Sequence, residues 1–70
     1  MPGGNIRYRL HYDTPLGKGC RRAGSCFLSM PFDLDFNREV AEAMCKGFGA
    51  GTHWIEDEEG EKVWPLENTP

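Results

Sequence analysis

Residues 6–13 alternate strictly between apolar or aromatic side chains and polar ones. The first set is Ile6, Tyr8, Leu10 and Tyr12, and the second is Arg7, Arg9, His11 and Asp13. Successive side chains of a strand point to opposite faces of a sheet, so this pattern predicts a half-buried β-strand. Such a strand must bury its apolar face against another element, and the rest of the chain has to supply that element.

A second strand is expected after a loop. Residues 14–19 hold one proline and two glycines, which favour a turn or loop. We expect the next strand to start near Ala23. Over residues 25–32 the even positions are apolar, while Phe27 falls on the polar side of the pattern; the even positions are Cys26, Leu28, Met30 and Phe32.

A helix is predicted from Phe36 to about Lys46. Its apolar side chains recur every four residues, at Phe36, Val40, Met44 and Phe48, with Ala41, Ala43 and Cys45 beside them. Asp33 or Asp35 is suited to cap its first turn, and three glycines (Gly47, Gly49 and Gly51) follow its end. The solvated face is expected to carry Asn37, Arg38, Glu39, Glu42 and Lys46.

Residues 52–66 are predicted to form a second hairpin. Trp54 and Ile55 precede an Asp57-Glu58-Glu59-Gly60 turn, and Val63 and Trp64 follow it. Aspartate first and glycine fourth are typical of a type I turn followed by a left-handed glycine, and Pro65 indicates an edge strand or a strand end. The fold class is therefore α+β, a small ββαββ domain in which one helix packs on one face of an antiparallel sheet of two hairpins. How the two hairpins meet in that sheet stays open.

The 70-residue length allows one domain, which we assign to residues 1–70 with frayed ends at 1–4 and 67–70. A chain this short buries only about 60% of the surface that its unfolded state exposes, so a partner or oligomerisation is expected to add stability. There is no signal-peptide pattern and no apolar run long enough to cross a bilayer. Three cysteines are an odd number, which favours reduced thiols and a cytoplasmic location.

Charge is segregated along the chain. Residues 1–32 hold five basic groups and one acid, whereas residues 33–70 hold three basic groups and ten acids. The halves therefore carry +4 and −7 within a formal net charge of −3. Such a chain can pair its own halves or show a partner two opposite patches.

The acidic half suggests a protein-binding site. Glu56-Asp57-Glu58-Glu59-Gly60-Glu61 lies between two tryptophans, and an aromatic anchor ringed by charge is typical of protein–protein hot spots. The predicted protein-binding residues are Trp54, Glu56, Glu58, Glu59, Glu61 and Trp64. The simpler interpretation is a solvated loop with at least one tryptophan in the core.

The basic half suggests a second candidate, a single-stranded nucleic-acid interface. One strand face and the adjoining loop and strand would join into one basic surface with Phe27 as a stacking platform. The residues are Arg7, Arg9, His11, Lys18, Arg21, Arg22 and Phe27. The downstream acids oppose this hypothesis because they would repel a phosphate chain. The simpler interpretation is a solvated face whose arginines pair with acids of the second hairpin.

Metal binding and catalysis have weaker support. A zinc-stabilised subunit would need three of Cys20, Cys26, Cys45, His11 and His53 to converge, but their spacing matches no zinc knuckle. We expect instead that Cys26 and Cys45 are small core residues, that Cys20 is a loop thiol, and that both histidines lie on the surface. Cys20 lies next to Arg21 and Arg22, which would favour its thiolate, but no residue spacing fixes a Cys–His pair. No phosphate loop or cofactor motif is present either, so we expect no enzyme, no metal and no cofactor.

The leading hypothesis is a non-enzymatic protein-interaction module that docks on a larger protein through the acidic hairpin. Many unrelated small proteins share this size and layout, including phage-encoded and mobile-element inhibitors of host machinery, and by that analogy the chain is an inhibitor or regulator. The alternatives are the nucleic-acid binder and the zinc-stabilised subunit. A homodimer through open sheet edges is compatible with each of these.

Overall fold

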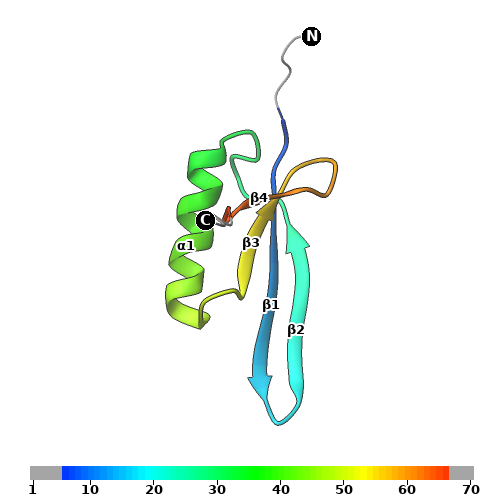
Figure 1. Ribbon diagram of the computed structural model, residues 1–70, viewed down its shortest axis with the longest axis vertical. Helices are drawn as coiled ribbons and strands as arrows, with labels where there is room; N and C mark the ends of the chain where they lie inside the picture. Colours follow the sequence, from blue (N-terminus) through cyan, green and yellow to red (C-terminus); the bar gives the residue numbers. More distant parts are fainter. Residues whose placement is uncertain (1–5, 67–70) are drawn as a thin grey trace.

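A computed structural model describes residues 6–66 of the chain. It has the element order β1 (Arg9–Gly17), β2 (Cys20–Cys26), α1 (Leu34–Phe48), β3 (His53–Glu56) and β4 (Lys62–Trp64) (Figure 1). This confirms the predicted ββαββ domain with four antiparallel strands and one helix. The frayed ends predicted at 1–4 and 67–70 lie outside the described residues. Within residues 6–66, α1 is too short and too polar to serve as a membrane span.

The two hairpins meet through β1 and β3, because the strand order is β2-β1-β3-β4. All three neighbouring pairs are antiparallel. Leu10 lies at the centre of the sheet, opposite Cys26 on β2 and Ile55 on β3. This order places the start of β1, the end of β2 and the β3–β4 turn at the same end of the sheet.

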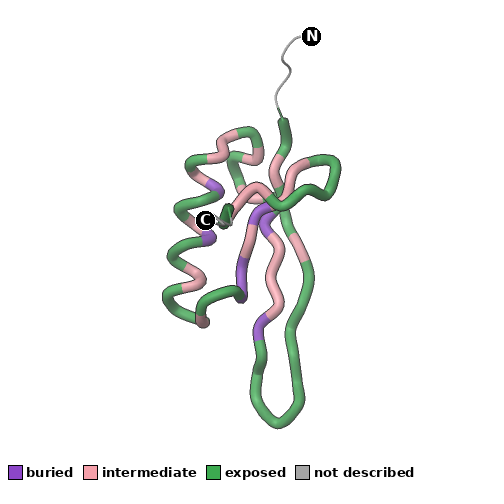
Figure 2. The backbone as a smooth tube through the Cα atoms, viewed as in Figure 1, coloured by how far each residue is buried: buried purple, intermediate pink, exposed green. Residues whose placement is uncertain are grey.

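The core is small and lies where α1 crosses β3 and β1. Its buried apolar residues are Leu10, Ala41 and Ile55, and Figure 2 shows buried residues on α1, β3 and β1. Partly buried side chains complete it: Tyr8, Leu28, Leu34, Val40, Val63 and Trp64. The helix covers one face only, and the β1–β2 hairpin extends beyond it (Figure 1).

The first hairpin is longer than predicted, and its second strand lies elsewhere. β1 starts at Arg9 instead of Ile6 and continues through the expected loop to Gly17, so that only Lys18 and Gly19 form the turn. Both turn residues have positive φ, 54° and 80°, as a two-residue type I′ turn requires. β2 therefore begins at Cys20, and the strand predicted over residues 25–32 is wrong.

Residues 27–33 form an irregular connection instead. Pro31 lacks an N–H, so it cannot donate to a strand ladder, and its carbonyl oxygen accepts a hydrogen bond from the Tyr8 N–H at 2.7 Å. The Met30 carbonyl oxygen accepts from the Asp33 N–H at 3.1 Å. These bonds turn the chain toward the start of α1.

The helix is close to its predicted range and extends by two residues at each end. Asp33 is the N-cap, since its carboxylate accepts a hydrogen bond from the Phe36 N–H at 3.0 Å. Gly49 is the C-cap. The expected solvated face is wrong at Asn37, which is fully buried because its amide nitrogen bonds two carbonyl oxygens of the preceding loop.

The second hairpin is confirmed. Gly60 has φ 85° and donates its N–H to the Asp57 carbonyl oxygen at 3.1 Å. The Asp57 carboxylate also accepts from the N–H groups of Glu59 and Glu61, at 2.9 and 3.0 Å. This Asx-type turn fixes the direction in which the acidic residues leave the sheet.

Several expectations for cysteine and histidine are corrected. Cys26 is exposed, because it lies on the part of the sheet that α1 does not cover, and exposed Cys20 belongs to a strand rather than a loop. Cys45 is partly buried, and its thiol donates to the His53 carbonyl oxygen at 3.3 Å. His53 is buried, not on the surface, since it faces α1.

Candidate functional site

The two tryptophans lie on opposite faces of the sheet. Trp64 is opposite Ile55 in register and packs against the core on the helix side. Trp54 lies between the buried residues His53 and Ile55 in sequence, so it points to the open face, where α1 does not reach. They therefore cannot flank one contact surface as the sequence pattern suggested.

Trp54 and Glu56 are engaged in contacts within the open face. The Trp54 ring stacks on His11 with centroids 5.8 Å apart, and its Nε1–H donates to Glu56 Oε2 at 2.8 Å. The other Glu56 carboxylate oxygen lies 3.2 Å from His11 Nε2. All three side chains are partly buried. This network orders the centre of the open face and leaves the Glu56 carboxylate with two partners.

The acidic turn, defined as residues 57–60, reaches the start of the described chain. Glu58 Oε2 accepts a hydrogen bond from the Arg7 backbone N–H at 3.0 Å. Glu59 and Glu61 are exposed, so their carboxylates remain available to a partner. The turn thus places negative charge beside the basic N-terminal segment.

An aromatic–arginine cluster, defined as Arg7, Arg9, Phe27 and Phe32, lies next to this turn. The Arg7 guanidinium is 5.4 Å from the Phe27 ring centroid and 5.6 Å from that of Phe32. The Arg9 guanidinium is 4.3 Å from Phe27, and it also donates to Ser25 Oγ at 3.2 Å. Residues Phe27 and Phe32 remain 44% and 50% exposed. Cation–π contacts hold these arginines over the rings at the surface.

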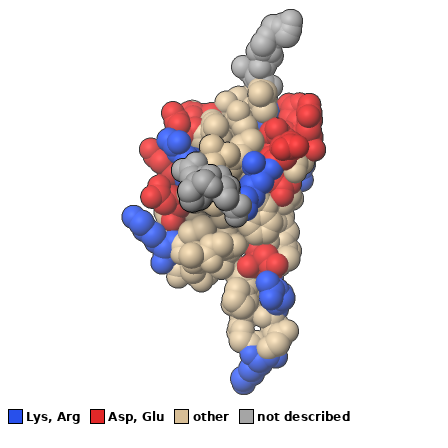
Figure 3. All heavy atoms as spheres, viewed as in Figure 1, with Lys and Arg blue, Asp and Glu red and all other residues tan. Residues whose placement is uncertain are grey.

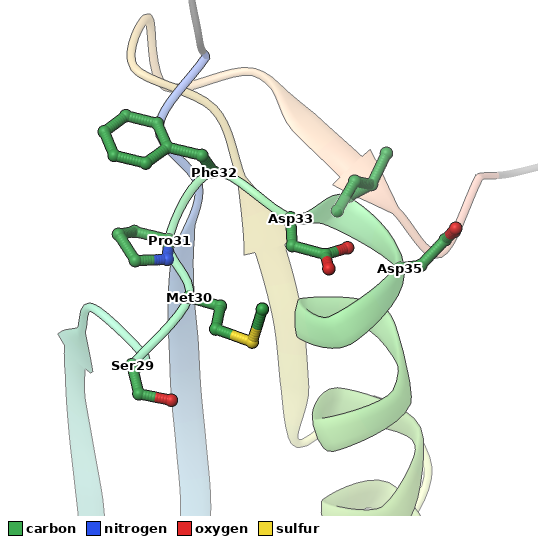
Figure 4. Close-up of a pocket in the computed structure, with 7 residues that line it drawn as sticks. Ser29, Met30, Pro31, Phe32, Asp33 and Asp35 are labelled. Carbon is green, nitrogen blue, oxygen red and sulfur yellow. The ribbon is translucent and has the colours of Figure 1, made fainter.

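A hollow of about 370 Å³ joins the cluster to the acidic turn. Its lining residues are Arg7, Arg9, Phe27, Asp57 and Glu58. A second hollow of about 640 Å³ lies along residues 29–35, and Figure 4 shows Met30 directed toward α1 and Phe32 directed away from it. We call the combined area of the aromatic–arginine cluster, Asp57 and Glu58 the end surface.

The predicted basic surface is split, because Lys18, Arg21 and Arg22 lie at the hairpin tip, far along β1 and β2 from the end surface. Figure 3 shows basic side chains at this tip and acidic ones over the β3–β4 loop. Arg21 Nε donates to Asp13 Oδ1 at 2.9 Å on the open face. That bond lowers the pKa of Asp13 below its ordinary value of 3.8. The seven proposed nucleic-acid residues therefore do not form one continuous face.

A groove of about 300 Å³ lies on the helix side, between α1 and the uncovered part of the first hairpin. Its apolar lining includes Leu10, Tyr12, Met44 and Phe48, with Arg22 at its margin. His53 is also part of this lining, and burial lowers its pKa below the ordinary value of 6.5.

The convergence that a zinc site needs is not found within residues 6–66, where no three His, Cys, Asp or Glu side chains are arranged to hold a metal ion. All five residues considered for zinc lie in this range. Cys20 and Cys26 occupy opposite ends of β2, and Cys45 lies on α1.

The cluster contains one residue that the sequence analysis missed. Phe32 was expected on the apolar face of a strand, whereas it projects from the irregular connection beside Arg7. The neighbouring Pro31 was the available signal, because proline is disfavoured inside a strand. The contact between the start of the first hairpin and the β3–β4 turn, made by the hydrogen bond from the Arg7 N–H to Glu58, had no signal in the local sequence.

Comparisons with protein-family models, curated proteins and solved structures return no match to this chain. The residues and geometry described above are therefore the basis for assigning a function.

Proposed function

We propose that this chain is a non-catalytic protein-interaction module, acting as an inhibitor or regulator, and that it docks on a larger protein through the end surface. The observation that supports this most is the pair of exposed rings, Phe27 and Phe32, with the Arg7 guanidinium within 5.6 Å of both centroids. Aromatic and arginine side chains are enriched among residues that dominate binding energy at protein interfaces.

The charge around these rings favours a protein partner over a nucleic acid. Arg7 and Arg9 share one hollow with Asp57 and Glu58, so positive and negative groups lie side by side. A phosphate chain entering this hollow would meet two carboxylates as well as two guanidinium groups. A protein surface can present an apolar side chain to the rings and match both signs around it.

The rest of the acidic hairpin has a different role in this proposal. Trp54 and Glu56 order the open face, and Trp64 stabilises the core. The exposed carboxylates of Glu59 and Glu61 extend the negative side of the end surface and steer a basic rim of the partner.

Replacing both Glu59 and Glu61 by lysine should slow association with the partner while leaving dissociation nearly unchanged, as stopped-flow or surface-binding kinetics would measure.

The docking surface is tested by affinity capture from a lysate of the cells that make this protein, with nuclease present. Phe27→Ser and Phe32→Ser are each expected to lower recovery of the retained protein at least about tenfold, which corresponds to about 1.4 kcal/mol. Quantitative mass spectrometry measures the recovery relative to the unmodified chain.

Phe48→Ser is the matched control, since Phe48 is an equally large ring that is 59% exposed but lies at the end of α1. Recovery with this variant should equal that of the unmodified chain. If Phe48→Ser abolishes capture while Phe27→Ser and Phe32→Ser do not, the partner docks in the helix-side groove and the end surface is not the site.

A further inference from the structure

We infer that two copies of this chain pair through their β2 strands, antiparallel and about a two-fold axis at Ala23, to form one continuous eight-stranded sheet. This interface lies at the edge of the sheet and uses none of the residues of the end surface. The dimer can therefore be tested independently of the proposed docking function.

The outer edge of β2 is free to pair within the described part of the chain. β2 is the first strand in the order β2-β1-β3-β4, and six of its seven residues are exposed. The opposite edge is less suitable, because β4 has three residues and is followed by Pro65. An exposed edge of this length is a template for another strand.

The backbone groups that face outward follow from one hydrogen bond. The Thr14 hydroxyl donates to the Arg22 carbonyl oxygen at 3.2 Å, so the carbonyl group of Arg22 points inward, toward β1. Backbone groups alternate in direction along a strand, so the N–H and C=O of Arg21, Ala23 and Ser25 point outward. Ala23 is the central residue of Cys20–Cys26, and two copies can exchange both bonds there.

The register about Ala23 avoids like charges in direct opposition. It places Arg21 opposite Ser25 of the second copy and Arg22 opposite Gly24 of the second copy. Small side chains at residues 23–25 allow the two backbones to approach. The Tyr12 ring, which lies over Gly24 on the helix side, would cover the new strand pair as well.

The same register brings two exposed cysteines together. Cys20 and Cys26 each lie three residues from Ala23, so Cys20 of one copy is opposite Cys26 of the other. This is a position without backbone hydrogen bonds, where opposite Cα atoms are about 4.5 Å apart, a separation that a disulfide can span. Within one copy these cysteines are about 20 Å apart along the strand, too far to bond.

Association with a second copy would also add stability to a domain whose core is small. Among residues 6–66, only Leu10, Ala41 and Ile55 form its buried apolar centre, and large apolar side chains remain exposed in many places. Domains of this size commonly gain stability by association. Pairing β2 strands would remove the longest open edge and extend the sheet without changing either copy.

Sedimentation equilibrium on the full chain under reducing conditions tests the dimer. The unmodified protein should sediment as a dimer, and Ala23→Pro should raise its dissociation constant at least tenfold. The Ala23 N–H points outward, so proline there removes both hydrogen bonds that the two copies exchange and is tolerated on an edge strand. Ala23→Lys is a second variant with the same expected effect, and Ala43→Lys on the exposed side of α1 is its control.

Thiol cross-linking tests the register. A mild thiol oxidant added as a probe takes two electrons and two protons from one Cys20 and one Cys26 thiol, and one S–S bond forms. Cys20→Ser mixed with Cys26→Ser should give a covalent dimer linked through the remaining Cys20 and Cys26. Neither variant alone should give that product.

Clear results would overturn the inference. One such result is an unmodified chain that remains monomeric at all accessible concentrations. A β2 edge that pairs with an extended peptide of another protein, and not with a second copy, would also give this result. Alternatively, each cysteine variant alone could cross-link as well as the mixture, which would exclude this register. Dimerisation unaffected by both Ala23→Pro and Ala23→Lys would place the interface elsewhere.

Discussion

The Tyr12 ring lies directly over Gly24 on the neighbouring strand, and a Cβ added at Gly24 would lie 2.8 Å from the Tyr12 hydroxyl oxygen. A side chain at residue 24 would have to displace the Tyr12 ring, whereas the backbone angle there is an ordinary one, since Gly24 is not among the positive-φ glycines. The ring covers the edge strand on the helix side of the sheet, in the part of the first hairpin that extends beyond α1.

Gly24→Val should lower the free energy of unfolding by about 1–2 kcal/mol, because the branched side chain would displace the ring. Urea denaturation measures this change. In a Tyr12→Ala background the cost should shrink by at least about 0.5 kcal/mol, which a double-mutant cycle isolates. Lys62→Val, at an exposed position of β4 away from Gly24, is the control. An equal cost in both backgrounds would show that the ring is not the cause.

His53 should make stability depend on pH. Burial lowers its pKa below 6.5, so the folded chain keeps a neutral imidazole at pH values where the unfolded chain takes up a proton. The free energy of unfolding should therefore decrease as the pH falls from 7 to 5. The lowered pKa of Asp13 acts only further down, around and below 3.8. Denaturation at fixed ionic strength across this range measures the slope.

His53→Asn should remove most of that slope between pH 7 and 5. His11→Asn is the control, because His11 lies on the opposite face of the sheet and the decline due to His53 should persist without it. A slope that survives His53→Asn would assign the pH dependence to another group.

Asn37 should be among the most sensitive positions of the helix. Its amide nitrogen donates to the carbonyl oxygens of Met30 and Asp33, at 3.0 and 2.7 Å. Asn37→Asp would place a carboxylate oxygen against these carbonyl oxygens in a buried site, at an expected cost of about 3 kcal/mol or more. Glu39→Gln, an exposed change on the same helix, should cost less than about 0.5 kcal/mol. Comparable losses in thermal or urea unfolding would contradict this role of Asn37.

The turn of the first hairpin offers a stabilising change. Lys18 has φ 54°, a conformation that asparagine adopts more easily than lysine, and Gly19 follows it. Lys18→Asn should raise the free energy of unfolding by about 0.5–1 kcal/mol, measured by urea denaturation. Lys62→Asn, at an exposed position in β4, should not stabilise, because strands disfavour asparagine. No gain from Lys18→Asn would show that this turn carries no strain.

The elements whose signals are local were predictable from sequence. The four-residue repeat and the cap at Asp33 located the helix, and Asp57 with Gly60 located the second turn. The first hairpin was misplaced because Lys18 is an unusual residue for its turn, and alternation at residues 26–32 continued past the true strand end. Asn37 could not be assigned to the interior, since its partners come from a loop that folds back on the helix.

The candidate site depended on long-range pairing. Arg9 and Phe27 meet because β1 and β2 pair, and the acidic turn reaches Arg7 because β3 pairs with β1 on its other side. Residue spacing holds no information about that strand order. The protein-binding and nucleic-acid hypotheses had assigned these groups to two separate surfaces.

The most direct test of the proposed function is an NMR footprint of the captured protein on the isotope-labelled chain, after nuclease treatment. We expect the largest amide shifts at Arg7, Arg9, Phe27, Phe32 and Glu58, with little change at the hairpin tip around Lys18. Shifts centred on Lys18, Arg21 and Arg22, or a partner lost on nuclease treatment, would contradict docking of a protein at the end surface.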